Sequence, residues 1–146
     1  MTRIIAGEAR GRTIKVPTEG TRPTADRARE GLFSSLAARW GFAGSSVLDL
    51  FAGSGALGLE AASRGAEEIV LVESSADAVK IIRHNMGVVK HPGVRVQEMK
   101  VGTYLGSAPR RHFDLVLADP PYAFDEVDEL IAAIEPVLSD NAMVVI

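Results

Sequence analysis

The sequence contains no cysteine, and only 5% of its 146 residues are aromatic. The missing thiols exclude disulfide bridges, thiolate zinc sites and any mechanism that needs a cysteine nucleophile. No apolar run approaches the roughly 20 residues that a helix needs to cross a bilayer. Residues 1–17 also lack the apolar stretch of a secretory signal. We therefore expect a cytoplasmic protein with no membrane partner.

Motifs for several other chemistries are missing as well. The three histidines, His84, His91 and His112, do not have metal-ligand spacing, so we predict no metal site. The sequence has no phosphate-binding loop with its lysine and no serine in a nucleophile elbow.

Charge is unevenly distributed along a chain whose net charge is −3. Residues 1–30 contain seven basic and four acidic side chains, whereas the rest of the chain contains nine basic and fifteen acidic ones. A basic N-terminal segment on an acidic body indicates a local contact with a polyanion, and a solvated charged surface explains the pattern equally well.

The first 40 residues are predicted to form a small extension. Residues 4–5 and 13–16 are β-rich and flank a glycine-containing stretch, which is typical of a hairpin. A proline-containing loop follows, and Thr24 is a suitable N-cap for a helix over 27–39. The apolar side of that helix would consist of Leu32, Phe33 and Leu36. We assign 1–40 to this extension and 41–146 to the core.

The core alternates between short apolar strands and helices. Strands are predicted at 47–50, 69–72, 94–96, 113–118 and 142–146, and helices at 56–63, 77–86 and 125–138. The last helix is expected to bury Leu130, Ile131 and Ile134. This alternation predicts an α/β fold with a Rossmann-like, mostly parallel sheet. Because a buried parallel strand is rarely an edge, we expect further strands beyond residue 146.

A glycine-rich turn follows the first core strand. Glycines let the backbone pass close beneath a bound cofactor and adopt positive φ. The spacing of Gly53, Gly55 and Gly58 also satisfies the dinucleotide pattern, so a nicotinamide or flavin oxidoreductase has to be considered. The cofactor contacts are assigned to Asp49, Phe51, Ala52, Gly53, Ser54 and Gly55, together with Glu73 and Asp119 from later strands.

Asp49 favours S-adenosylmethionine over a dinucleotide as this cofactor. A carboxylate in the mouth of the glycine turn would repel a pyrophosphate, whereas it attracts the ammonium and sulfonium groups of S-adenosylmethionine. Glu73 follows the second strand, where an acid usually accepts hydrogen bonds from ribose hydroxyls. After the third strand, any of Glu98, Met99, Lys100 and Val101 is a candidate neighbour of an adenine, and a plain loop is an equal alternative.

The proposed catalytic residues are Asp119, Pro120, Pro121 and Tyr122, which follow the fourth strand. Ligands bind at the carboxyl ends of parallel strands. Two prolines stiffen the turn and leave the Pro120 carbonyl free, while Asp119 adds a second acceptor. Two acceptors suit an exocyclic amine on a nucleic-acid base, because they hold its hydrogens and direct its lone pair. Tyr122 would stack on an extruded base.

These motifs resemble a known group of enzymes. VLDLFAGSG at 47–55 and DPPY at 119–122 resemble the amino-methyltransferases that act on nucleic-acid bases. GEARGRTIKVP at 7–17 and RPTADRAREGLF at 22–33 closely resemble the RsmD family, which methylates guanine N2 in bacterial small-subunit ribosomal RNA.

The resemblance implies a ribosomal RNA substrate, within an assembled or assembling ribosomal particle. It places Arg22, Thr24, Asp26, Arg27 and Glu30 near the cofactor and the RNA. The expected RNA contacts are Arg10, Arg12, Arg22 and Arg27. Two alternatives remain, an adenine-N6 methyltransferase acting on DNA or RNA, and an inactive RNA-binding assembly factor.

Overall fold

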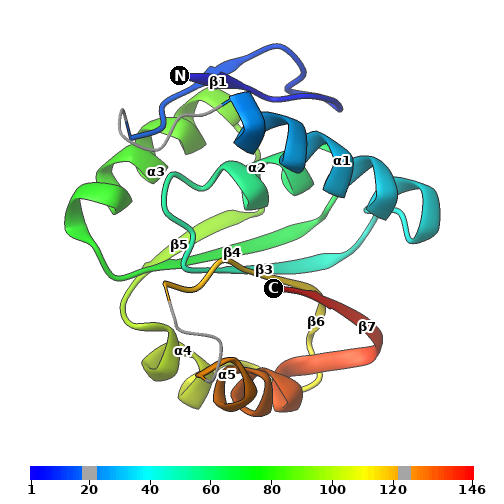
Figure 1. The fold of residues 1–146 in the computed structure, drawn as a ribbon, viewed down its shortest axis with the longest axis vertical. Coiled ribbons are helices and arrows are strands. Elements are labelled where there is room, and N and C mark those ends of the chain that lie inside the picture. The colour runs from blue at the N-terminus through cyan, green and yellow to red at the C-terminus, as the bar shows by residue number, and fades with distance from the viewer. Residues whose placement is uncertain (18–22, 122–125) are drawn as a thin grey trace.

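A five-stranded parallel sheet forms the centre of the molecule (Figure 1). The structure is a computed structural model that describes residues 1–17, 23–121 and 126–146, with only the backbone of 23–26. The strands are β3 (Ser46–Leu50), β4 (Glu68–Glu73), β5 (Val94–Glu98), β6 (Phe113–Ala118) and β7 (Leu138–Val145). Their spatial order is β5-β4-β3-β6-β7. The direction of winding reverses between β3 and β6, and α/β sheets bind ligands at the carboxyl ends of strands beside such a reversal.

Helices cover both faces of this sheet (Figure 1). One face carries α1 (Pro23–Arg39), α2 (Ala56–Ser63) and α3 (Ala76–Val89). The other carries α4 (Val101–Ser107), α5 (Val127–Ile134) and the short 3₁₀ helix η2 (Glu135–Val137). Successive strand residues point to opposite faces, so Val47 belongs to the apolar cluster beneath α1–α3 and Leu48 to the cluster beneath α4 and α5.

Close packing between α2 and the sheet explains one glycine of the motif. A Cβ added at Gly58 would lie 2.2 Å from the Leu71 side chain and 3.1 Å from the Asp49 carboxylate. The first distance is shorter than real contacts and the second is tight, so a side chain at this position would displace Leu71 or push α2 away from the sheet. Gly58 therefore allows the glycine-rich turn to lie close to the sheet.

The N-terminal hairpin lies against α2, beyond the helical layer (Figure 1). Its strands are β1 (Thr2–Arg3) and β2 (Thr13–Ile14), which pair antiparallel. The fully buried Glu60 carboxylate on α2 accepts the backbone N–H groups of Ile5 and Ala6 at 2.9 and 3.1 Å. The hairpin is therefore attached to the core by buried polar groups as well as by apolar packing.

The predicted α/β alternation and parallel sheet are confirmed, and several boundaries differ. The 56–63 helix and the 113–118 strand match the structure, whereas the first hairpin strand lies two residues before its predicted place. The last helix spans only 127–134 and passes into η2 at Pro136, so the final strand begins at 138. α1 begins at Pro23, four residues earlier than predicted.

One expectation about the helices is wrong, and one helix was not predicted. Ile131 is 46% exposed, because the i, i+4 pair Leu130 and Ile134 occupies the face of α5 that meets the sheet. Residues 101–107 form α4, although two glycines in this stretch disfavour a helix. Burial of Val101, Tyr104 and Leu105 against the sheet compensates for that weak local preference. Within the described ranges, no helix is long and apolar enough to cross a membrane.

Candidate active site

The glycine-rich turn joins β3 to α2 in a backbone conformation that ordinary residues avoid. Gly53 and Gly55 have φ angles of 59° and 82°, and Gly55 is the left-handed N-cap of α2. Phe51 also has a positive φ of 57°, which is uncommon for a residue with a bulky side chain. Such conformations are costly and cluster at ligand sites. The turn is therefore shaped to bring backbone close to a ligand.

Asp49 lies beneath this turn and is only 1% exposed. Its Oδ2 accepts the backbone N–H of Gly58 at 3.0 Å, so it also satisfies a donor in the first turn of α2. The pKa of Asp49 is raised to about 8, chiefly by burial and also by the charges of Asp119 and Glu73, while the hydrogen bond from Gly58 acts in the opposite direction. Without a ligand, Asp49 is therefore mostly protonated at neutral pH. A cation beside it would favour the carboxylate and lower this pKa.

Glu73 connects the end of β4 to the glycine-rich turn. One carboxylate oxygen accepts the N–H of Gly53 at 2.9 Å, and the other accepts the N–H of Ser75 at 2.8 Å. The side chain remains partly exposed. Glu73 therefore fixes the shape of the turn and still presents acceptor lone pairs to the solvent side.

A cavity of about 540 Å³ opens beside Glu73. It is lined by Phe51, Val72, Glu73, Ser74, Lys100, Val101, Gly102 and Thr103. Small-molecule cofactors bind in cavities of roughly 300–1,000 Å³ with apolar walls and a few polar groups. Two of the four candidates after the third strand, Lys100 and Val101, line the cavity, whereas Glu98 and Met99 are not among its lining residues.

The residues that the sequence predicts to be catalytic begin directly beside the glycine-rich turn. Leu50 of β3 pairs with Ala118 of β6, so Phe51 and Asp119 leave the sheet at the same level. The Asp119 charge also raises the pKa of Asp49, so the two carboxyl groups interact electrostatically. Asp119 and Pro121 are exposed and Pro120 is partly exposed, whereas Tyr122 lies outside the described residues.

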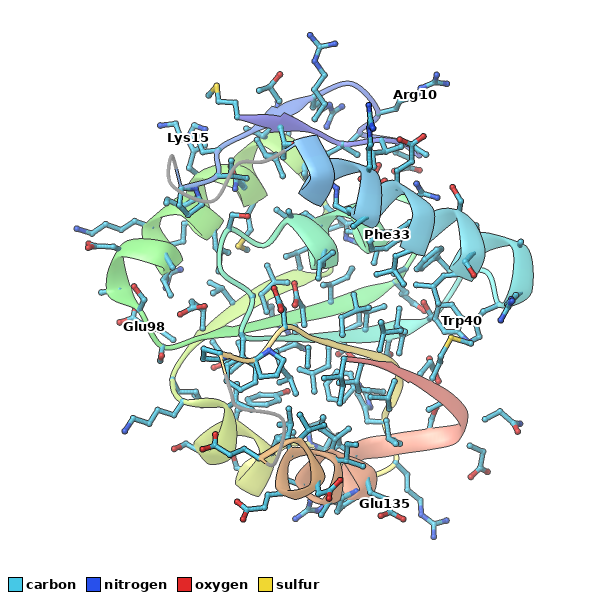
Figure 2. All side chains as sticks on the ribbon, in the orientation of Figure 1. Arg10, Lys15, Phe33, Trp40, Glu98 and Glu135 are labelled. Atoms are coloured by element: carbon cyan, nitrogen blue, oxygen red, sulfur yellow. The ribbon has the colours of Figure 1, made fainter. Side chains whose placement is uncertain are left out.

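The predicted RNA contacts do not share one environment. Arg10 and Arg27 are exposed. Arg10 lies on the hairpin (Figure 2), and Arg27 belongs to α1. The Arg12 guanidinium donates to the carbonyls of Val88 and Val89, at 3.2 and 3.0 Å, where α3 ends. Arg12 therefore has a structural contact that the sequence did not reveal. Arg22 lies outside the described residues, and the side chains of Thr24 and Asp26 are not described.

Two buried polar residues near the site were missed from the sequence. Glu60 binds the hairpin, and Asn85, which is fully buried on α3, binds both Lys15 and Ser54. The available signal was position, because Asn85 lies three residues after Ile82 and four before Val89, on the apolar face of α3. A polar residue on an apolar helical face requires buried hydrogen-bond partners. Across residues 1–17, 23–121 and 126–146, no three His, Asp or Glu side chains gather as a metal site.

Comparison with solved structures places the fold among Rossmann-like methyltransferases. A precorrin-6y C5,15-methyltransferase from Geobacter metallireducens GS-15 superposes with a TM-score of 0.73, covering 90% of this chain and 65% of that one. Its sequence identity is 19%, so this similarity shows the fold alone.

Sequence comparison gives the family. The family model described as conserved hypothetical protein 95 matches residues 2–146. Ribosomal RNA small subunit methyltransferase D of Escherichia coli (strain K12) is 38% identical over 145 residues, covering 97% of this chain and 72% of that protein. The solved structure of yhhF from Escherichia coli has a TM-score of 0.80 at 38% identity, covering 99% of this chain and 75% of that one. The chain belongs to the RsmD family.

Proposed function

We propose that this chain transfers a methyl group from S-adenosylmethionine to the exocyclic N2 of a guanine in small-subunit ribosomal RNA. The observation that carries the proposal is the meeting of two motifs at one sheet edge. The glycine-rich turn, with Asp49 beneath it, leaves β3 at the point where Asp119 leaves the adjacent strand β6. The Escherichia coli relative, named as a ribosomal RNA small subunit methyltransferase, supplies the substrate class.

The residues at the turn fit S-adenosylmethionine, which supplies an electrophilic methyl group when bound. Gly53 and Gly55 leave room for close approach of the methionine portion, and the protonatable Asp49 can ionise beside its positive charges. Glu73 lines the cavity together with Phe51 and is placed to accept hydrogen bonds from hydroxyl groups. We assign Ala52 and Ser54 to the same contact surface.

The acceptor half of the site is assigned to Asp119, Pro120, Pro121 and Tyr122. The Asp119 carboxylate and the Pro120 carbonyl would each hold one hydrogen of the exocyclic amine, which directs its lone pair toward the methyl group. Asp119 would then take the proton that leaves the nitrogen after transfer. Tyr122 is assigned to stacking on the extruded base.

The extension, residues 1–40, is proposed to contact the RNA. Arg10 and Arg27 are exposed and available to phosphates, and Arg12 and Arg22 complete the assigned set. A basic patch confined to one segment of an acidic protein suits a preformed RNA shape with an accessible base. We therefore propose that the substrate is an assembled or assembling ribosomal particle, which places the enzyme in the cytoplasm. Residues 41–146 would form the catalytic core.

The test uses small ribosomal subunits from a strain that lacks the endogenous enzyme. The protein is incubated with these subunits and methyl-labelled S-adenosylmethionine, and the RNA is digested to nucleosides. Label in N2-methylguanosine supports the proposal, and the Asp119→Ala chain is the matched control. Label in N6-methyladenosine, or only in added DNA, would identify an adenine methyltransferase. Cofactor binding without turnover on any RNA would identify an assembly factor.

A further inference from the structure

Asn85 contacts two segments that lie far from it in the sequence. Its Oδ1 accepts the backbone N–H of Lys15 at 2.8 Å. Its Nδ2 donates to the backbone carbonyls of Lys15 at 2.8 Å and of Ser54 at 2.9 Å. One carboxamide therefore joins the N-terminal segment to the glycine-rich turn. Figure 2 shows Lys15 at the hairpin end of the molecule, above the helical layer.

The orientation of this carboxamide is determined by its partners. The Lys15 N–H can only donate, so it must face the oxygen, and both hydrogens on the nitrogen then have a carbonyl partner. Asn85 is fully buried when both segments are docked, and its bonds to Lys15 and Ser54 lie in partly buried surroundings. Moving either segment away leaves polar atoms of the carboxamide without their present partners, which costs free energy.

The two segments therefore depend on each other through Asn85. If the glycine-rich turn changes conformation and the Ser54 carbonyl moves away, one Nδ2 hydrogen loses its partner. The carboxamide is then held less firmly, so its hydrogen bonds to Lys15 are weaker. Undocking of Lys15 similarly leaves the carboxamide without two of its partners. When two events share one set of hydrogen bonds, each favours the other, and the effect is reciprocal.

We propose that Asn85 is a positioning residue that couples docking of the N-terminal segment to cofactor binding at the glycine-rich turn. This inference rests on the proposed function, because it takes the turn to be the S-adenosylmethionine site. Cofactor binding would then hold in place the segment that leads into the proposed RNA-binding arginines. Because the coupling is reciprocal, contact of this segment with RNA would strengthen cofactor binding by the same factor.

The decisive measurement is backbone amide hydrogen exchange at Lys15, with S-adenosylhomocysteine as the probe. In the unmodified chain, saturating S-adenosylhomocysteine should slow exchange of the Lys15 amide by roughly tenfold, a typical coupling. In the Asn85→Asp chain, the carboxylate still accepts the Lys15 N–H but cannot donate to the carbonyls of Lys15 and Ser54. That chain should therefore lose the response to ligand and bind S-adenosylhomocysteine roughly tenfold more weakly.

Arg12→Gln is the matched control. It removes a different contact between the same segment and α3, at Val88 and Val89, and leaves the Asn85 bonds intact. The Lys15 amide of this variant should exchange faster than in the unmodified chain, both with and without ligand. Binding of S-adenosylhomocysteine should still slow its exchange by the same factor as in the unmodified chain. This pattern separates loosening of the segment from loss of coupling.

Each contrary result has a distinct meaning. Binding to the unmodified chain with no change at Lys15 would overturn the coupling and leave the proposed function standing. No binding to the unmodified chain would overturn the proposed function. A ligand response that persists in the Asn85→Asp chain would remove Asn85 from the coupling. If that chain does not fold, the measurement on the unmodified chain still decides whether coupling exists.

Discussion

One carboxylate oxygen of Glu73 accepts a hydrogen bond from the backbone N–H of Gly53 at 2.9 Å. The acid at the end of β4 thus shapes the turn at the end of β3, besides facing the cavity. A residue with both roles affects ligand binding in two ways when it is removed.

Replacing Glu73 with alanine should therefore weaken S-adenosylmethionine binding by roughly ten- to a hundredfold, since a hydrogen bond to a charged group is worth about 1.5–3 kcal/mol. Calorimetry measures the affinity, and circular dichroism checks the fold. Glu73→Gln keeps one acceptor oxygen and should lose less affinity for S-adenosylmethionine than Glu73→Ala. Glu67→Ala is the control, because Glu67 is exposed just before the opposite end of the same strand. Unchanged affinity in a folded Glu73→Ala chain would remove Glu73 from the site.

The raised pKa of Asp49 predicts how stability depends on pH. In the unfolded chain this carboxyl releases its proton near its ordinary pKa of 3.8, whereas the folded chain retains the proton up to a pKa of about 8. The contribution of Asp49 to folding is therefore fully present below pH 4, declines as the pH rises, and is lost above about pH 8. Denaturant unfolding across this range should show a decline in the unmodified chain that is absent in Asp49→Asn. Parallel pH profiles for the two chains would contradict the prediction.

Asp119 is predicted to act on the acceptor and not on the cofactor. Asp119→Ala should bind S-adenosylmethionine with nearly normal affinity and lose roughly a hundredfold or more in turnover, as when one preorganised polar group is deleted. Its loss should also lower the pKa of Asp49, because the Asp119 charge contributes to raising it. Asp140→Ala, an exposed acid on β7, is the control and should keep full activity. Near-normal turnover in Asp119→Ala would refute the catalytic role.

The exposed arginines should determine the salt dependence of RNA binding. Replacing Arg10 and Arg27 together with glutamine should lower the slope of log affinity against log salt by about 1–2, because each phosphate contact releases counterions. Arg110→Gln is the control, since Arg110 is exposed near the start of β6. If the slope does not change, these arginines belong to an ordinary solvated surface.

Glu60 should matter for stability and not directly for chemistry. Glu60→Ala would leave the N–H groups of Ile5 and Ala6 without their acceptor and break the ion pair with Arg64. We expect a loss of about 3 kcal/mol in the free energy of unfolding, measured by urea denaturation. An exposed substitution such as Glu135→Ala should cost less than about 0.5 kcal/mol. Equal urea midpoints of unfolding for the two variants would show that attachment of the hairpin does not depend on Glu60.

The sequence predicted the parts of the fold that depend on strong local patterns. Apolar runs such as that of β6 predicted the strands, and the glycine-rich turn predicted the start of α2. Together they predicted the edge of the sheet at which the two motifs meet. The sequence did not predict α4, because packing of Tyr104 and Leu105 outweighs the poor helix propensity of its glycines. Nor did it predict that Ile131 faces outward.

At the site, the sequence indicated which residues take part more readily than it indicated their protonation or their hydrogen-bond partners. The position of Asp49 was apparent from its motif, but its protonation depends on burial and on two other acids, which only the folded arrangement brings together. The contacts of Arg12 with Val89 and of Asn85 with Lys15 were not predicted, because these partners lie 77 and 70 residues away. Long-range hydrogen bonds of this kind leave almost no local signal.

The bond between Lys15 and Asn85 spans 70 residues, which has a consequence for the growing chain. Lys15 is synthesised early, yet its partner on α3 emerges from the ribosome only after β3, α2 and β4 have been made. Contacts of high sequence separation must wait for the intervening chain to close. The arginine-bearing N-terminal segment therefore leaves the ribosome well before α3, and its docking on the helical layer is complete only after Asn85 has emerged.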